Sequence, residues 1–383
     1  YNPELNHYNN ESKPARTKSV GIFGELYYDL TDSTKFTLGA RYTYDNKSVR
    51  SRQYLLDTAF LGSLPPFRNQ SASWHNGTGV ASLKQDLDLG FTDSSMVYVS
   101  VSRGFKPGGF NPPSLAGSGV ADTFDPEIVW AYEVGTKNQF WENRVQANFT
   151  GFFYDYEGYQ ISKIVARTSV NENIDAYIWG LEAEFVVVPI DDLRLEANLA
   201  YLGSEIQSGT SIDPADPSAG IPGFVNIKNA DGSNSVCAGT AVAGTIAGGG
   251  GCTGPLFDGF AKNLAGRELP NTPDIQINLT AEYTFAAPWE GYLTPRINYY
   301  WQNEMYGRFF NEVRDEIDSW SQANAGIRWN NEENSVYVDL WVRNFTDNDD
   351  ITAHYFTDAS SGNFTNVFVL QPRTWGITAG LTF

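Results

Sequence analysis

The chain has 383 residues and carries 26 basic and 45 acidic side chains, which give a formal net charge of −19. This excess of acid argues against a nucleic-acid partner, because binding phosphates requires a basic face. Aromatic residues make up 14% of the chain, and this composition excludes an intrinsically disordered protein.

Apolar and polar residues alternate one by one in segment after segment of the chain. Within 35–47, for example, Leu38 and Tyr42 fall on one face of an extended chain, and Arg41 falls on the other. This period of two predicts β-strands with one apolar and one polar face. We expect about thirteen such strands, each of roughly ten residues or more. In chain order they are 18–29, 35–47, 76–88, 95–104, 127–139, 144–159, 174–188, 194–206, 273–286, 292–305, 320–330, 335–344 and 370–383.

Short and long connections alternate between these predicted strands. Tight turns rich in Asp, Thr, Asn or Pro occur at 30–34, 141–143, 189–192 and 331–334. In an up-and-down antiparallel sheet, strict alternation places all tight turns at one end and all long loops at the other. The long loops are predicted at 48–75, 105–126, 160–173, 207–272, 306–319 and 345–369.

This arrangement is typical of an outer-membrane β-barrel, which has short periplasmic turns and long extracellular loops. No run of roughly 20 apolar residues predicts a transmembrane helix, and a barrel instead crosses lipid with alternating strands. The apolar faces would then contact lipid and the polar faces would line the lumen. A β-propeller or a large sandwich is the alternative, since alternation alone fits any half-buried sheet. The charged residues expected on the polar side are Arg41, Glu182, Glu184, Arg194, Glu196, Arg296, Arg328, Asp339 and Arg343.

The two cysteines of the chain, Cys237 and Cys252, lie in one Gly- and Ala-rich segment. Their spacing predicts one local disulfide in an oxidising compartment, which would contribute about 3 kcal/mol in the chain-entropy model. Two unpaired thiols are the alternative. No metal site is predicted here, because no histidine or second cysteine pair lies nearby.

Four stretches of the chain resemble those of a known family. They are 102–111 (SRGFKPGGFN), the C-terminal 372–383 (PRTWGITAGLTF), 342–347 (VRNFTD) and 27–32 (YYDLTD). Together, and in this order, they resemble TonB-dependent outer-membrane receptors, in which a barrel of about 22 strands is closed by an N-terminal plug. The resemblance implies that residues 1–383 form the C-terminal part of such a barrel. An incomplete barrel would be an open sheet with two unpaired edges, completed by strands and a plug from a longer chain or a partner chain.

Candidate catalytic residues are few. His7, His75 and His354 are far apart in the sequence and match no metal or nucleophile motif. We therefore predict no catalytic residue, no metal and no cofactor. An outer-membrane hydrolase using His354 with a neighbouring aspartate is an alternative.

Ligand capture by the long loops is the leading functional hypothesis. Aromatic side chains beside a guanidinium can bind a ligand through apolar faces and a bidentate anion contact. The alternative is that these aromatics serve only in loop packing and in the interfacial girdle. The candidate residues are Tyr306, Arg308, Phe309, Phe310, Phe105, Lys106 and Phe110.

The resemblance implies a receptor in the outer membrane of a Gram-negative bacterium. It would import a scarce nutrient, with a ferric siderophore as the leading candidate, and it would be energised by TonB acting on the plug. Lipopolysaccharide and other outer-membrane lipids would contact the barrel wall. The alternatives are a passive porin-like channel, an outer-membrane hydrolase and a soluble extracellular binding protein.

Overall fold

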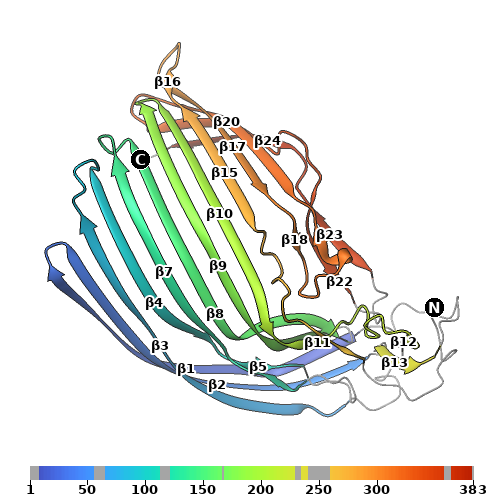
Figure 1. The fold of residues 1–383 in the computed structure, drawn as a ribbon. Coiled ribbons are helices and arrows are strands. Elements are labelled where there is room, and N and C mark those ends of the chain that lie inside the picture. The colour runs from blue at the N-terminus through green and yellow to red at the C-terminus, as the bar shows by residue number, and fades with distance from the viewer. Residues whose placement is uncertain are drawn as a thin grey trace.

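The computed structural model of the protein describes residues 8–55, 65–112, 121–165, 168–228, 234–239, 259–357 and 364–381. One curved antiparallel sheet dominates the part of the chain that is described (Figure 1). Among these residues no helix is long and apolar enough to span a bilayer. The strands of the main sheet are β1 (Tyr8–Thr31), β2 (Thr34–Leu55), β3 (Arg68–Leu87), β4 (Ser94–Lys106), β7 (Glu127–Phe140), β8 (Val145–Val165), β9 (Thr168–Ile190), β10 (Leu193–Ser208), β15 (Ile275–Tyr283), β16 (Phe285–Ala286), β17 (Tyr292–Gln302), β20 (Trp320–Asn330), β21 (Val336–Arg343) and β24 (Thr374–Leu381).

The order of these strands in space follows their order in the sequence. The sheet runs β1-β2-β3-β4-β7-β8-β9-β10-β15-β17-β20-β21-β24, and the short β16 pairs with β17 off this path. Each of the thirteen predicted segments therefore corresponds to a strand of the sheet. Within the described residues, β1 and β24 stand at the two ends of the sheet and do not pair with each other, so the sheet is open, as the sequence predicts.

The register places apolar and charged residues on opposite faces. Partners that lie directly opposite each other share a face, so Leu199 and its partner Ile277 lie on the face that Leu279 and Tyr299 also share. The side chains of Leu38, Leu199 and Leu279 are 46%, 40% and 42% exposed. The strand alternation puts every charged residue predicted for the polar side on the other face, and the predicted two-faced sheet is confirmed.

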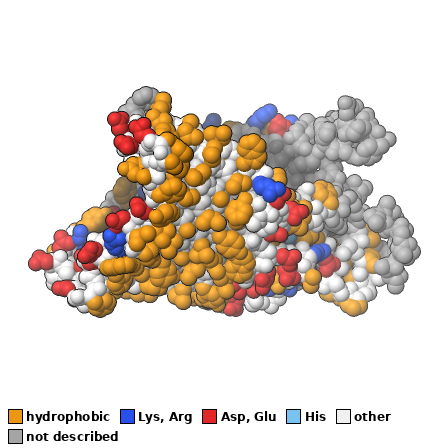
Figure 2. All heavy atoms as spheres, turned by 90° about the horizontal axis from the view of Figure 1, so that it is seen from above, with side chains coloured by type: hydrophobic (Ala, Val, Ile, Leu, Met, Phe, Trp, Pro, Cys, Tyr) orange, Lys and Arg blue, Asp and Glu red, His pale blue; other side chains and the backbone are white. Residues whose placement is uncertain are grey.

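Ion pairs join neighbouring strands across the polar face. Arg296 Nε lies 3.2 Å from Glu282 Oε1, and Arg328 Nη2 lies 2.7 Å from Asp339 Oδ2. Figure 2 shows hydrophobic side chains spread over the middle of the face in view, with acidic and basic side chains gathered toward its ends. This separation of apolar from charged side chains suits a wall between hydrocarbon and a wet interior.

Several strands extend farther than the alternation predicts, and the predicted loop 160–173 is wrong. The β8–β9 ladder continues to the pair Val165–Thr168, after a bulge between Tyr156 and Tyr159. At about 3.3 Å per residue, the 21 residues of β8 are longer than a bilayer requires. Pairing above the membrane needs no apolar face, so hydrophobic alternation gives no signal there.

The remaining elements are short and lie in the connections between main strands. Figure 1 shows β11, β12, β13, β22 and β23 gathered at one end of the sheet, with β16 at the other. The long connections thus share one end, as predicted, whereas the tight turns lie opposite. These small elements are β5 (Gly109–Phe110), β6 (Thr123–Phe124), β11 (Thr210–Ile212), β12 (Phe224–Lys228), β13 (Asn234–Ala238), β14 (Ala261–Asn263), β18 (Met305–Tyr306), the 3₁₀ helix η1 (Val313–Asp315), β19 (Glu316–Ile317), β22 (Ile351–Phe356) and β23 (Thr365–Val369).

Candidate functional site in the loops

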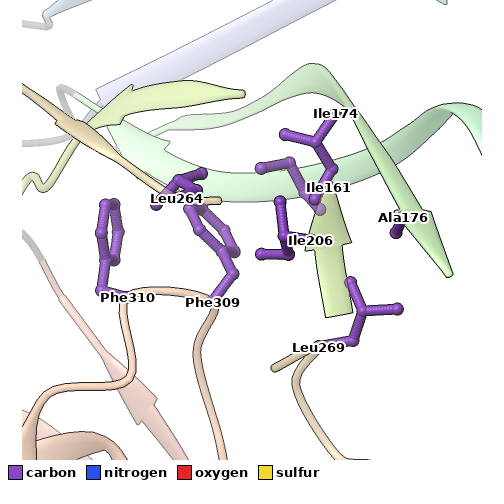
Figure 3. Close-up of a cluster of buried hydrophobic side chains, with 8 residues drawn as sticks. All are labelled: Ile161, Ile174, Ala176, Ile206, Leu264, Leu269, Phe309 and Phe310. Atoms are coloured by element: carbon purple, nitrogen blue, oxygen red, sulfur yellow. The ribbon is translucent and has the colours of Figure 1, made fainter. Parts of the chain in front are cut away.

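A hydrophobic cluster anchors the loops to the sheet. Phe309 and Phe310 are only 4% and 1% exposed, and they pack with Leu264 against side chains from β8, β9 and β10 (Figure 3). Ile206 on β10 and Ala176 on β9 fall on the polar-face side of their strands by alternation. The loop segment 306–315 is therefore held over the polar face of the sheet, where the interior of a barrel would open. The cluster consists of Ile161, Ile174, Ala176, Ile206, Leu264, Leu269, Phe309 and Phe310.

Arg308, next to these aromatics, lies between two buried carboxylates. Its Nη1 is 2.9 Å from Asp213 Oδ1, and its Nη2 is 2.7 Å from Asp315 Oδ1, with both carboxylate side chains fully buried. The guanidinium also lies over the rings of Phe310 and Phe356, at 5.1 and 4.6 Å from their centroids. Such cation–π contacts add to the ion pairs when the cation is partly desolvated.

Asp213 is the centre of a wider network of ion pairs. Arg314 Nη2 lies 2.6 Å from Asp213 Oδ2, and Lys262 Nζ lies 3.7 Å from the same oxygen. Burial opposes ionisation of Asp213, but the charges of Arg308 and Arg314 and hydrogen bonds from Arg308 and the Ala215 amide outweigh it and lower the pKa of this carboxyl. The network therefore joins the loop after β10 to the loop after β17 through ionised groups.

Glu268, in the segment before β15, has a pKa shifted the other way, because the pKa of this carboxyl is raised. Its pKa is raised first by burial and then by the negative charges of Asp274 and Glu304. The Asn311 side chain accepts a hydrogen bond from the Glu268 amide at 2.6 Å, which fixes the backbone there. The loop region thus favours the ionised form of Asp213 and disfavours the ionised form of Glu268.

A cavity of about 360 Å³ opens between several segments of the chain. Its walls come from the β8–β9 hairpin, the segment after β11, the segment before β15 at Pro270, the loop 307–310 and the strand β22. The volume falls within the range of small-ligand pockets, which runs from about 300 to 1,000 Å³. Lining residues include Lys163, Pro214, Pro270, Arg308, His354 and Phe356.

His354 forms one wall of the cavity and closes over the backbone of Gly307. Its Nε2 is 2.8 Å from the carbonyl oxygen of Asp315, while its buried Nδ1 has no hydrogen-bond partner among the described residues. A Cβ atom at Gly307 would overlap the imidazole ring, so only glycine allows this close approach. His354 therefore positions β22 against the loop rather than pairing with an aspartate for acid–base catalysis.

The structure brings four of the seven predicted ligand-binding residues together. Tyr306 pairs with Glu316 in the β18–β19 ladder, and Arg308, Phe309 and Phe310 follow it and line the cavity. These residues also have a structural role, because the two phenylalanines pack in the hydrophobic cluster and Arg308 forms buried ion pairs. Their contact with a ligand stays a prediction.

The other three predicted residues lie at the end of β4 and in β5. Lys106 Nζ is 3.2 Å from Glu127 Oε2, and Phe110 packs against Trp74 with ring centroids 6.1 Å apart. Phe105 lines a separate hollow near β1 and β2. They do not line the cavity at Arg308, and their part in ligand binding stays a prediction.

Lys163 is a cavity residue that sequence reasoning missed. Its Nζ lies 2.8 Å from Glu172 Oε1 and donates hydrogen bonds to Ser211 Oγ and the Ile212 carbonyl. It falls within the segment predicted as the loop 160–173, where no pattern distinguished it from other polar residues. Asp213 also gives no local signal, because its partner Arg308 is 95 residues away.

The predicted disulfide falls partly outside the described residues. Cys237 is buried in β13, whereas Cys252 lies outside the described ranges. The bridge between them stays a prediction.

Comparison with known proteins gives a consistent result. A family model described as the β-barrel of TonB-dependent receptor-like proteins matches residues 1–345. The ferric yersiniabactin uptake receptor FyuA from Yersinia pestis aligns with 18% identity and a TM-score of 0.71 over 100% of this chain and 48% of its own. The siderophore receptor PiuA from Acinetobacter baumannii aligns with 17% identity and a TM-score of 0.65 over 95% and 43%. The ferric-catecholate import receptor Fiu from E. coli K12 aligns with 16% identity and a TM-score of 0.62, over 96% of this chain and 45% of its own. The chain thus spans about half the length of these receptors.

Proposed function

The chain belongs to the TonB-dependent receptor β-barrel family, and from this premise we propose that it forms the wall, the mouth and the ligand-capturing loops of an outer-membrane importer of ferric siderophores. The matched family and the aligned structures are transport receptors, and the prediction that the chain is not an enzyme is confirmed. The aligned structures include siderophore receptors, a ferric citrate transporter and a copper transporter.

One observation carries this proposal. The loops at one end of the sheet fold over its polar face and line a cavity of about 360 Å³, with aromatic and cationic groups in its walls. A ligand bound there would lie at the entrance to the barrel interior, where release leads inward. A passive channel needs no such binding site at its mouth.

Transport would be coupled to energy through a plug that TonB engages. Strands and a plug from the remainder of the receptor would pair with the open edges at β1 and β24. Lipopolysaccharide and other outer-membrane lipids would contact the exposed apolar face, where the hydrocarbon of the bilayer accepts side chains such as Leu199 and Leu279. The protein would lie in the outer membrane of a Gram-negative bacterium.

Uptake of radiolabelled ferric siderophores by iron-starved cells tests the proposal. Cells that express the complete receptor should accumulate iron, and cells that lack it should not. An uncoupler that collapses the proton-motive force should abolish accumulation without abolishing binding to the cell surface. Accumulation that persists with the uncoupler would favour a passive channel, and the absence of any receptor-dependent uptake or binding would contradict the proposal.

A further inference from the structure

The cavity at Arg308 contains charged groups, yet each of them already has a partner. Among the described residues that line it, Lys163 and Arg308 are the cationic side chains. Glu172 neutralises Lys163 at 2.8 Å, and the two buried carboxylates Asp213 and Asp315 neutralise Arg308. A ligand entering the cavity therefore meets ion pairs rather than free cations.

The network behind Arg308 is balanced as a whole. Within the part of the chain that the structure describes, ion pairs of 4.0 Å or less connect four basic and four acidic side chains of this network, so their charges cancel. The field of such a network falls off faster than that of an isolated charge. The members are Lys262, Arg267, Arg308, Arg314, Asp213, Asp216, Glu312 and Asp315.

An anionic ligand would have to compete with these carboxylates. It would lose its hydration on entry, and the protein could offer compensating contacts only by breaking ion pairs that are already buried. An uncharged ligand has no such desolvation penalty. It gains instead from burying apolar surface against Ile164, Pro214, Pro270 and Phe356, which also line the cavity.

We propose that this cavity selects an electrically neutral, ring-bearing ligand, or the neutral arm of a metal chelate, and discriminates against anionic chelates. This inference rests on the proposed function and adds the charge class of the substrate. It also reverses the sequence-based expectation that Arg308 pairs with an anionic group of the ligand, because the guanidinium is already paired with protein carboxylates.

The Lys163–Glu172 pair offers the sharpest test. Glu172 is 32% exposed, whereas Lys163 is only 9% exposed, so Glu172→Gln removes one charge without emptying a buried site. Gln can still accept a hydrogen bond from Ser211, which now donates to Glu172 at 2.7 Å. The variant leaves Lys163 at the cavity wall without its carboxylate. Glu332→Gln is the matched control, because Glu332 is exposed in the turn between β20 and β21, at the opposite end of the sheet.

The probes are a neutral ferric trihydroxamate and a trianionic ferric tricatecholate, and binding is measured on the complete receptor. We expect the wild type to bind the neutral chelate at least about tenfold more tightly than the anionic one. Glu172→Gln should then reduce that preference by about tenfold, as expected for one unit charge near the ligand at intermediate dielectric. Glu332→Gln should leave it unchanged.

The outcomes separate this inference from the proposed function. Receptor-dependent uptake with a wild-type preference for the anionic chelate would overturn the neutral-ligand inference and leave the importer intact. An unchanged preference in a folded Glu172→Gln variant would also overturn it. Binding and uptake of neither chelate would overturn both proposals.

Discussion

Replacing Arg308 with methionine is the strongest test of the loop network. The change removes the charge and keeps an unbranched side chain of similar reach. Asp315 is fully buried and would lose its cation, whereas Asp213 would keep Arg314 and Lys262. Breaking a buried ion pair by removing one partner costs about 3–5 kcal/mol. Because part of the compensation remains, we expect the lower end of this range, about 3 kcal/mol.

Hydrogen exchange is the appropriate assay, because loops open locally without global unfolding. A loss of about 3 kcal/mol corresponds to exchange that is faster by about a hundredfold in 306–317 and 209–217. Exchange in the membrane-spanning part of β21 should not change. The control is Arg373→Met, which breaks the exposed pair with Asp347 at 3.1 Å and should cost no more than about 1 kcal/mol. Equal effects of the two variants would show that the buried network contributes no more than a surface ion pair.

Three further predictions concern a turn and two carboxyl groups. Gly291→Ala should destabilise the protein by at least about 1 kcal/mol, measured by urea unfolding, because Gly291 has a φ of +81° and a Cβ would overlap the Asn330 carbonyl. The control Gly24→Ala should not destabilise it, because Gly24 has open space around it. Glu268→Gln should slow proteolysis of the loop at neutral pH, because the raised pKa of Glu268 means that its ionised form destabilises the loop. The difference in proteolysis rate between variant and wild type should vanish as acid protonates the wild-type Glu268. An equal difference at every pH would contradict the raised pKa. Because the pKa of Asp213 is lowered from 3.8, protection of the loop against hydrogen exchange should persist above pH 3.8 and be lost only as the pH falls through the lowered pKa. Loss of this protection well above pH 3.8 would refute the shift.

The sheet could be predicted from the sequence because its signal is local. Leu38 and Arg41 are three positions apart and must fall on opposite faces of any strand, so the pattern alone assigns them. The β8–β9 extension to Val165 escaped prediction because pairing outside the membrane imposes no alternation. The open sheet followed from the family resemblance rather than from the residues.

The cavity could be predicted only in part. Tyr306, Arg308, Phe309 and Phe310 form a recognisable aromatic and basic segment, and the structure does place them at the loop end of the sheet. The sequence gives no sign that Arg308 is paired with Asp213, because the two residues are 95 positions apart and no local periodicity links them. Which charges cancel is a property of the three-dimensional packing.

The ion network also limits how such a receptor can be re-engineered. A graft of 306–317 onto another barrel would transfer Arg308 and Asp315 but not Asp213, and the transplanted guanidinium would lack one of its two carboxylates. A graft of the segment that holds Asp213 would transfer a buried anion without Arg308. Exchange of substrate preference between related receptors should therefore require both segments to be transplanted together.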